Sequence, residues 1–496
     1  MSRRHRGIAT SVLLAFALSA CASTVQATHN VTTAAIGSDT TQQPGAHSAN
    51  AGPSGNVANP QGSLPRAGSP SDLGSTGPTA GSDAAMTPPT DSTTTTTSGG
   101  TQAAVRGTGF TATTARLGIV YQTGTAAAAS AIGVNGATDV NYRSFIDALI
   151  AAYNAQGGIL GRKIVPVYYA FDLAHALANY ASAEQEACTA MTQDTKVFAV
   201  ASTLGTECLT HARVPNARVN TEYADDSSFF SQHAPYVYDP NILNTDALTP
   251  LLLDRLQARG FLTRASKIGL FYADQPVDQR IMNKLKSAFA ARGLTVAATY
   301  AYDKSSASSI ATSAPNGVLP FRSKGVDRIL SFDANIDFFM QGAENQGYRP
   351  KYAVTTYHLL NSTLPAIAPK AQLTGSMGVG WMPISDVSPS DQSTLSGTAL
   401  CKKALAQSGQ AGSYNFATAT YCDAVALFVQ GARAGGSLTP TGIRAGLTKL
   451  GTSFSSAMNF RSAYGQGRYD GALAVRDISY NTGCSCYRYD GTGLRS

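Results

Sequence analysis

From residue 115 onward, short apolar runs alternate with longer amphipathic segments, and this alternation constrains the fold more than any other feature. Residues 116–121 are rich in β-branched and apolar side chains and predict a strand. Apolar side chains then recur three and four residues apart over 142–153, which predicts a helix with one buried face, ended by Gly157 and Gly158. The pattern continues with expected strands at 163–169, 197–201 and 217–221 and expected helices at 176–191 and 207–213.

The pattern restarts near residue 248. A helix ending at Gly260 is followed by expected strands at 267–272, 295–302, 328–332 and 352–356 and by expected helices at 277–291 and 336–346. Such alternation predicts parallel sheets covered by helices on both faces, and the restart predicts two of them. The 496 residues also exceed what one hydrophobic core usually serves. We therefore expect an α/β fold of two doubly wound, Rossmann-like lobes, with ligand bound at the carboxyl ends of facing strands.

The amino terminus has the pattern of an export signal. Arg3, Arg4 and Arg6 precede an apolar run over 8–18, which is too short to span about 30 Å of hydrocarbon. Residues 18–21, Leu-Ser-Ala-Cys, are similar to a bacterial lipobox. We expect removal of a signal peptide over 1–20 and diacylation of Cys21, which would hold the protein on the outer face of the cell membrane. The alternative is an ordinary secretion signal cleaved near 25–27, with Cys21 incidental.

Residues 21–114 differ in composition from the rest of the chain. They are rich in Thr, Ser, Ala, Gly and Pro, contain no Lys, Tyr or Trp, and have Phe110 as their one aromatic residue. Such a segment buries too little apolar surface to offset chain entropy. We expect a disordered tether, with Thr/Ser/Pro clusters suited to glycosylation.

Six cysteines follow Cys21, and an even number in an exported chain favours disulfides. We expect the pairs nearest in sequence, Cys188 with Cys208 and Cys401 with Cys422. Cys484 and Cys486 then close a small ring or pair elsewhere. A metal site is disfavoured there because no His lies nearby in sequence.

Charge and motif content exclude several functions. The net charge is +7, and three of the positive charges belong to the expected signal. No Lys/Arg stripe follows, so we expect no nucleic-acid partner. The sequence contains no His-Glu-x-x-His, Gly-x-Ser-x-Gly or Gly-x-x-x-x-Gly-Lys motif. We therefore expect no enzyme, no cofactor and no metal.

Three stretches resemble a known family. Residues 153–164, Tyr-Asn-Ala-Gln-Gly-Gly-Ile-Leu-Gly-Arg-Lys-Ile, are similar to the helix end and turn before the second strand of type 1 periplasmic binding proteins, the leucine/isoleucine/valine-binding group. Residues 267–274 look like the strand that opens the second lobe, and 421–425 resemble the start of a late helix. The resemblance implies two lobes joined by three crossings, near 238–241, 379–383 and 451–456. Lobe one would then comprise 115–240 and 381–453, and lobe two 241–380 and 454–496.

The resemblance also implies ligand contacts at strand ends. In lobe one it points to Gln122 and Thr123, to Ser202 and Thr203, and to Thr221, Glu222 and Tyr223. Glu222 and Tyr223 depart from the small Ala-Thr segment usual in the family, and Val277-Asp278 replaces its frequent Tyr-Gly. In lobe two and the crossing the candidates are Asp274, Asp333, Tyr357 and Trp381. The plainer interpretations are an ordinary turn at 121–124, helix caps at 202–206, Asp274 and Asp333, and hinge packing for Trp381.

The resemblance implies that the protein binds a small molecule without catalysing a reaction on it. We expect a monomeric lipoprotein that binds a small molecule, amino-acid-like or another small polar or aromatic solute, and hands it to an ABC-type permease. The alternative is a sensor or other non-transport binding protein of the same fold at the cell envelope. A hydrolase is a third and weaker hypothesis.

Overall fold

The computed structural model describes residues 107–127, 139–176, 179–203, 206–219, 224–361 and 364–496. The expected signal over 1–20, Cys21, most of the tether, and Thr221, Glu222 and Tyr223 lie outside these residues. Within the described ranges, no helix combines the length and the apolar character needed to cross a membrane.

The first sheet has the order β2-β1-β3-β4-β5, and every pairing in it is parallel. β2 lies at an edge, as Pro166 predicts. Its strands are β1 (Thr114–Thr123), β2 (Lys163–Asp172), β3 (Ala199–Ser202), β4 (Asn216–Arg218) and β5 (Val237–Tyr238). The helices between these strands are α3 (Tyr142–Ala155), α4 (Leu173–Ala176), α5 (Tyr180–Thr189), the π-helix η1 (Ala190–Asp194), α6 (Thr206–His211) and α7 (Ser227–His233).

The second sheet has the order β12-β11-β10-β9-β8-β6-β7. Pairing is parallel from β10 to β7 and antiparallel for β11 and β12. Its strands are β6 (Ile268–Ala273), β7 (Val296–Tyr302), β8 (Arg328–Leu330), β9 (Lys351–Thr355), β10 (Met377–Gly380), β11 (Arg476–Asn481) and β12 (Cys486–Tyr489). The helices between β5 and β10 are α8 (Thr245–Ala258), α9 (Pro276–Ala291), α10 (Ala307–Ser313), η2 (Ala314–Gly317), α11 (Val318–Ser323), α12 (Ile336–Asn345), η3 (Thr356–His358), α13 (Leu364–Ile367) and α14 (Lys370–Leu373).

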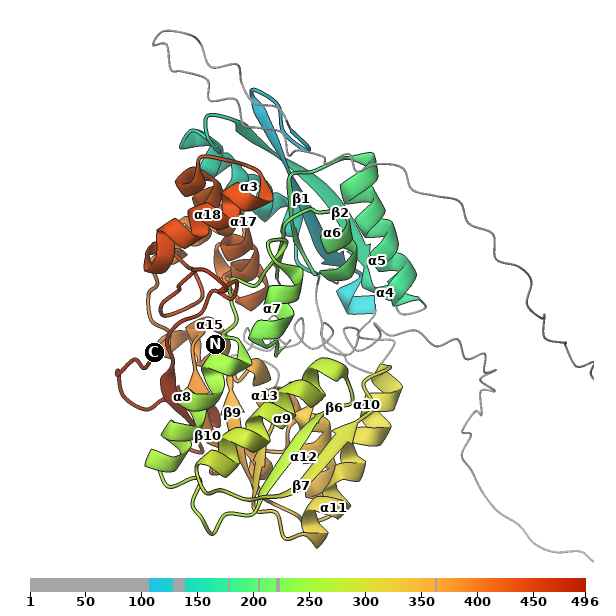
Figure 1. Cartoon of the computed structure of the whole chain (residues 1–496), viewed down its shortest axis with the longest axis vertical. Coiled ribbons are helices and arrows are strands. Elements are labelled where there is room, and N and C mark those ends of the chain that lie inside the picture. Colours follow the sequence, from blue (N-terminus) through green and yellow to red (C-terminus); the bar gives the residue numbers. More distant parts are fainter. Residues whose placement is uncertain (1–106, 128–138, 177–178, 204–205, 220–223, 362–363) are drawn as a thin grey trace, which may run out of the picture. The chain divides into compact units, whose positions relative to one another are not determined.

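Between β10 and β11 the chain returns to the first lobe. There α16 packs on α3, and α17 packs on β3 and β4. The elements of this return are α15 (Pro383–Asp386), η4 (Pro389–Asp391), α16 (Thr398–Gln407), η5 (Ala411–Ser413), α17 (Phe416–Gly435), α18 (Pro440–Leu450) and η6 (Gly451–Ser453). The chain therefore passes between the two sheets three times (Figure 1).

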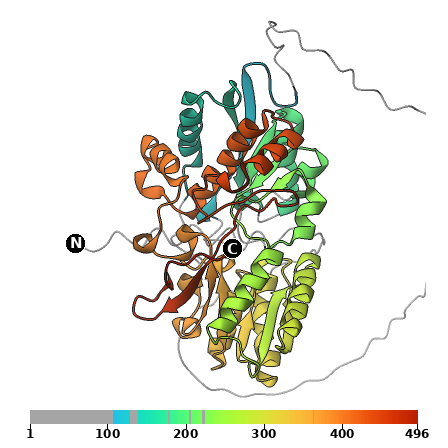
Figure 2. The ribbon, with the colours of Figure 1, turned by 60° about the vertical axis from the view of Figure 1, so that its left-hand side comes forward.

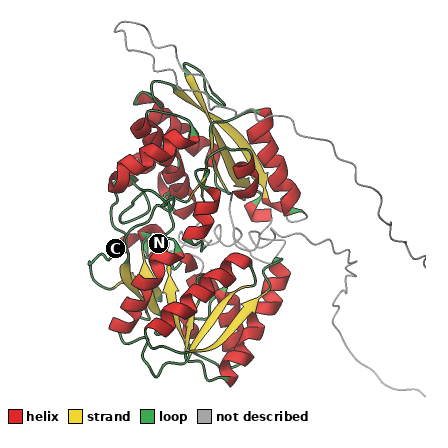
Figure 3. Cartoon of the chain, viewed as in Figure 1, coloured by secondary structure: helices red, strands yellow, loops and turns green. Residues whose placement is uncertain are grey.

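Helices cover both faces of each sheet (Figures 2 and 3). In the first sheet, Ile119 joins the apolar cluster that includes α3 and α17, whereas the next residue, Val120, joins the cluster around α5. In the second sheet, Leu270 packs with α8 and α9, whereas Phe271 packs with α11 and α12. Successive strand residues face opposite sides, so both faces must be apolar and covered. The prediction of two doubly wound α/β lobes is confirmed.

The motif over 153–164 is a helix stop held by its own side chains. Asn154 accepts a hydrogen bond from Ile164 N (2.7 Å) and donates one to Ile164 O (2.9 Å), which ties the end of α3 to β2. Gly158 has φ +62°, and a Cβ there would lie 2.0 Å from Arg162 O. Arg433 of α17 donates to the Gly158 carbonyl at 2.6 Å. Close backbone packing therefore requires glycine at 158, whereas at 157 glycine is favoured by a φ of +90°.

Two local predictions differ from the structure. The helix expected over 176–191 is split into α4 and α5, because the side chain of Asn179 accepts from Ser182 N (3.1 Å) and caps a new helix. Residues 107–113, expected as the end of the tether, pack against the first lobe. Arg116 N donates to Gly109 O at 2.8 Å, and the ring of Phe110 packs against the lobe core.

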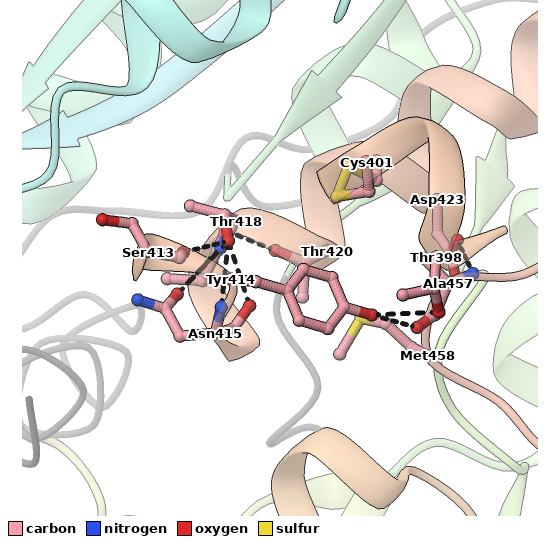
Figure 4. Close-up of a disulfide and its surroundings, with 12 residues drawn as sticks. Thr398, Cys401, Ser413, Tyr414, Asn415, Thr418, Thr420, Asp423, Ala457 and Met458 are labelled. Carbon is pink, nitrogen blue, oxygen red and sulfur yellow. Dashed lines mark hydrogen bonds between the residues drawn. A yellow bond between two sulfur atoms is a disulfide. The ribbon is translucent and has the colours of Figure 1, made fainter. Parts of the chain in front are cut away.

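Three disulfides join the cysteines of the lobes. The structure pairs Cys188 with Cys208, Cys401 with Cys422, and Cys484 with Cys486. The second of these links α16 to α17 (Figure 4). Beside it, Tyr414 OH donates to Ala457 O (2.8 Å) and Asp423 accepts from Ala457 N (2.6 Å). The third crossing, residues 451–475 between α18 and β11, is therefore fixed to α17 near its start.

The first crossing, residues 239–244, is held through its backbone carbonyls. Three side chains from elsewhere donate to them: Asn459 Nδ2 to Pro240 O (2.7 Å), Trp381 Nε1 to Asn241 O (2.9 Å) and Tyr357 OH to Leu243 O (2.7 Å). The other two carbonyls accept hydrogen bonds from the backbone of the third crossing. Gly471 N donates to Asp239 O (2.8 Å), and Ala472 N donates to Ile242 O (2.9 Å). Each carbonyl from 239 to 243 thus has a partner, which buried backbone requires.

Substituting Tyr357→Phe tests this arrangement. It removes one hydrogen bond to a buried carbonyl without changing volume, so we expect a loss of about 1–2 kcal/mol in the free energy of unfolding. Hydrogen exchange followed by mass spectrometry should show faster exchange in a peptide covering 239–244. The control is Tyr348→Phe, which loses a similar bond to Val326 O (2.6 Å) inside lobe two. Equal exchange at the crossing in both variants would contradict the assignment.

Candidate functional site

The carboxyl ends of the two sheets meet through an ion pair. Asp226 follows β4 and caps α7 of lobe one, where it accepts from Phe229 N at 3.0 Å. Arg280, on the α9 helix that follows β6 in lobe two, donates from Nε (2.7 Å) and from its terminal nitrogen (2.9 Å) to the two oxygens of Asp226. The paired geometry fixes both direction and distance between the lobes.

Lys284 extends this pair into an interlobe ion cluster, defined as Asp226, Asp246, Arg280 and Lys284. Its Nζ lies 3.0 Å from Asp226 and 2.9 Å from Asp246. The side chain of Asp226 has no exposed surface. Burial by itself would raise the pKa of Asp226, but the hydrogen bonds from Arg280, Phe229 N and Lys284 hold it well below its usual range.

A second buried cation lies at the end of β4. Arg218 pairs with Asp225 and with Asp239, the latter at 3.1 Å, and its guanidinium lies 5.0 Å from the ring centroid of Phe229. Asp225 also accepts through its backbone carbonyl from Thr245 N at 2.9 Å. Arg218 therefore ties the end of β4 to the first crossing.

Asp333, a candidate from the sequence, is occupied within lobe two. Its carboxylate accepts from Tyr302 OH (2.5 Å) and from Asn335 N (2.9 Å), and Lys304 Nζ lies 3.4 Å away. Burial would raise the pKa of Asp333, but the ammonium of Lys304 and these hydrogen bonds outweigh it, and the pKa lies below the usual value. The N-cap of α12 is Asn335, so Asp333 is not the helix cap; it holds the turn before α12 through its bond to Asn335 N.

Asp278 is the carboxyl at this edge that has no partner. It lies in the first turn of α9 and is partly exposed, and among the described residues no group hydrogen-bonds it. Burial, with the nearby charges of Asp333 and Asp225, raises its pKa to about 7, against the opposing effect of Lys304 and Arg280. Arg280, two residues later on α9, binds Asp226 of lobe one, so Asp278 lies in the turn of this lobe-two helix that meets lobe one.

The cations around Asp278 are already paired with other carboxylates. Arg280 binds Asp226, and Lys304 binds Asp333. A carboxyl in such a place either keeps its proton or receives a cation from outside. The sequence showed Asp278 only as a departure from the family's Tyr-Gly. The signal that could have selected it is an acid in the first turn of a helix directly after a buried strand.

Asp274, four residues earlier, differs from Asp278 in its surroundings. It is exposed and accepts from Gln279 Nε2 at 2.6 Å. The two acids at the end of β6 are therefore one solvated carboxylate and one partly desolvated carboxyl.

The lobe-one candidates lie at the ends of β1 and β3. Gln122 and Thr123 are partly exposed, whereas Ser202 and Thr203 are buried. Ser202 Oγ donates to Asn216 Oδ1 at 2.8 Å. β1 and β3 are neighbours in the sheet, so these side chains share one edge. Thr221, Glu222 and Tyr223 lie outside the described residues.

Tyr357 and Trp381 lie in the hinge. Both are fully buried, their rings meet edge to face at 5.1 Å, and their polar atoms bind the first crossing as described above. Trp381 N also donates to Thr356 Oγ1 at 2.9 Å. This geometry is that of hinge packing, the plainer of the two interpretations of Trp381.

The family comparison agrees with this architecture. A family model described as periplasmic binding protein matches residues 130–478. The chain belongs to the type 1 periplasmic binding proteins. No curated protein sequence is significantly similar to it.

Solved structures share the fold at low sequence identity. A solute-binding protein of an ABC transporter from R. palustris, in complex with 4-hydroxybenzoate, has a TM-score of 0.54 and 16% identity over 77% of this chain and 97% of that one. A type 1 periplasmic binding protein from Bordetella pertussis Tohama I has a TM-score of 0.55 and 14% identity over 76% and 100%. A substrate-binding protein from Desulfitobacterium hafniense, in complex with Leu, has a TM-score of 0.50 and 16% identity over 76% and 99%.

Replacing Arg280 and Lys284 together by Gln tests the interlobe ion cluster. Asp226 would remain buried without a cation, so we expect a loss of at least about 2 kcal/mol in the free energy of unfolding and a larger radius of gyration by small-angle X-ray scattering. A depressed pKa stabilises the fold above the usual aspartate pKa, and this contribution disappears as the pH falls below about 4. The acid-induced loss of stability should therefore be smaller in the double variant.

The control is Arg292→Gln, at the C-cap of the same helix. Arg292 pairs with Asp254 at 2.8 Å within lobe two, where the acid is largely exposed. We expect a change of at most about 1 kcal/mol and no change in radius of gyration. An unchanged radius in the double variant would show that the cluster does not hold the lobes together.

Proposed function

We propose that the protein is an extracytoplasmic solute-binding lipoprotein that captures a small molecule between its lobes and delivers it to an ABC-type permease. Family membership supports the capture, and so does the meeting of the two carboxyl edges. Ligands of doubly wound sheets bind at that edge. Closure of the lobes on the solute would shift the population from open to closed states.

The single observation that carries this proposal is the partly exposed, unpartnered carboxyl of Asp278 in the turn of α9 that meets lobe one. A positively charged nitrogen of the solute would supply a counter-ion for Asp278, because the nearby cations of the protein are paired with other carboxylates. Gln122 and Thr123 would contribute polar contacts from lobe one, with Ser202 and Thr203 at the same edge. Asp274 would lie at the solvated rim, and Asp333, Tyr357 and Trp381 would support the walls.

The proposal does not carry over the ligands of the structural relatives. The structures in complex with 4-hydroxybenzoate and Leu share 16% identity with this chain. The departures at Asp278, Glu222 and Tyr223 argue for a different solute from a free branched-chain amino acid.

The amino-terminal segment supports attachment to the membrane. We propose that Cys21 is diacylated after removal of residues 1–20, and that 21–106 connects it to the first lobe. A second candidate function, sensing or another non-transport task at the envelope, is favoured by the length of this tether. Both functions use the same solute site.

Capture is tested by isothermal titration with agmatine and benzamidine as cationic probes and benzamide as the neutral one. Losing a charge-assisted bond costs about 1.5–3 kcal/mol, so Asp278→Asn should raise the dissociation constant for a bound cation at least about tenfold. Asp274→Asn is the matched control and should change it less than about threefold. Native mass spectrometry of the purified protein would identify a retained solute. A retained anion whose dissociation constant is unchanged by Asp278→Asn would contradict the proposed site.

The ligand-free protein makes a separate test of Asp278. Its pKa of about 7 exceeds the usual value near 4, so the folded state holds this proton longer than the unfolded chain. Stability should then fall as the pH rises from about 4 to 7. Asp278→Asn should flatten this dependence in melting temperatures measured across that range, and an unchanged slope would show that Asp278 titrates normally.

Lipid attachment is tested by expressing the full chain in a lipoprotein-processing bacterium fed radiolabelled palmitate. The native chain should incorporate label and partition into detergent, because two acyl chains anchor stably. Cys21→Ser should lose both properties, whereas Cys484→Ser should keep them. Label retained by Cys21→Ser would favour the ordinary secretion signal.

A further inference from the structure

A cavity of about 320 Å³ lies at the hinge, apart from the interlobe site. It is bordered by residues 452–473 of the third crossing and by Ser396, which follows the second. None of its lining residues belongs to the candidate solute site. The volume is at the lower end of the range for small-molecule sites.

One wall of this hinge cavity is apolar and rigid. Phe454, Phe460 and Leu473 line it. The ring of Phe460 lies 5.1 Å from Tyr489 and beneath the guanidinium of Arg476 at 5.2 Å. Phe454 meets Tyr464 edge to face at 5.2 Å. These contacts hold two ring faces in place before any ligand arrives, which lowers the entropic cost of binding.

The polar wall carries one positive charge and no acid. Arg461 lines the cavity, and among the described residues it has no ion pair or side-chain hydrogen bond. Thr452 and Ser396 add hydroxyl groups. Behind the wall, Asp423 is fully buried and accepts from Ser456 Oγ at 2.5 Å. Burial raises the pKa of Asp423 to about 7, so its negative charge is reduced near neutral pH.

Asn459 supplies a further polar atom at this wall. It is 3% exposed, and its Nδ2 binds Pro240 O at 2.7 Å and Ser462 Oγ at 3.2 Å. Its Oδ1 is buried and has no hydrogen-bond partner in the described part of the chain. An ionised carboxylate carries no donor for this acceptor, so Asn459 shapes the polar wall and is not counted among the ligand contacts proposed below.

We propose that the hinge cavity is a second binding site, which takes a small organic carboxylate with a flat apolar body. The carboxylate would pair with the guanidinium of Arg461, because the planar arginine fork can donate two parallel hydrogen bonds to a carboxylate. The apolar body would lie against Phe454 and Phe460. The site is separate from solute capture, so it can exist whether or not the interlobe proposal holds.

The probe is benzoate, and benzamide is its neutral counterpart. Each is titrated into the full-length protein at pH 7 and followed by calorimetry. We expect benzoate to bind and benzamide to bind more weakly. Arg461→Gln should weaken benzoate binding about tenfold and leave benzamide unchanged. Because Arg461 is exposed, the variant should fold with an unaltered melting temperature.

Two controls separate this site from others. Arg264→Gln removes another exposed guanidinium, on lobe two, and should leave benzoate binding unchanged. Asp278→Asn alters the interlobe site and should also leave it unchanged. Absence of benzoate binding at 10 mM, or binding that Arg461→Gln does not weaken, would overturn the proposal. Benzoate seen at the hinge cavity in a crystal of the complex would support it.

Discussion

The carbonyl groups of the first crossing organise the molecule. Two lobes can swing about a hinge only if the hinge backbone stays satisfied where it is buried, and here donors reach it from distant parts of the chain. Trp381 and Asn459 come from the other two crossings, and Tyr357 comes from the strand end in lobe two. Since a buried carbonyl without a partner costs about 1–3 kcal/mol, this arrangement holds the crossings as one unit.

Where the two lobes meet, one carboxyl group, that of Asp226, is paired with cations, and another, that of Asp278, is not. Asp226 is buried and neutralised by Arg280 and Lys284, so it contributes attraction between the lobes. Asp278, two residues before Arg280 on the same helix, has no such partner. One turn of α9 thus carries both Arg280, which binds the other lobe, and Asp278, whose carboxyl a bound cation could neutralise. Solute binding and closure would therefore reinforce each other, since both act on the same helix.

Sequence reasoning succeeded where the cause is local. The apolar spacing over 142–153 matches the buried face of α3. Gly157 and Gly158 end that helix for a reason visible in the backbone angles. The periodicity does not predict the split between α4 and α5, because the capping Asn179 lies among helix-forming neighbours. The end of the tether was placed too late, because Phe110 finds an apolar surface that composition alone does not show.

By itself, the sequence determined the strand and helix order, the two-lobed class, the family resemblance and the edge position of β2. All of these follow from periodicity, turn residues and motifs that act over a few positions. The tertiary structure alone decided which charged groups meet. Asp226 lies 54 positions from Arg280 and 58 from Lys284. No local pattern encodes such pairs, because they depend on how the crossings bring one strand edge against another.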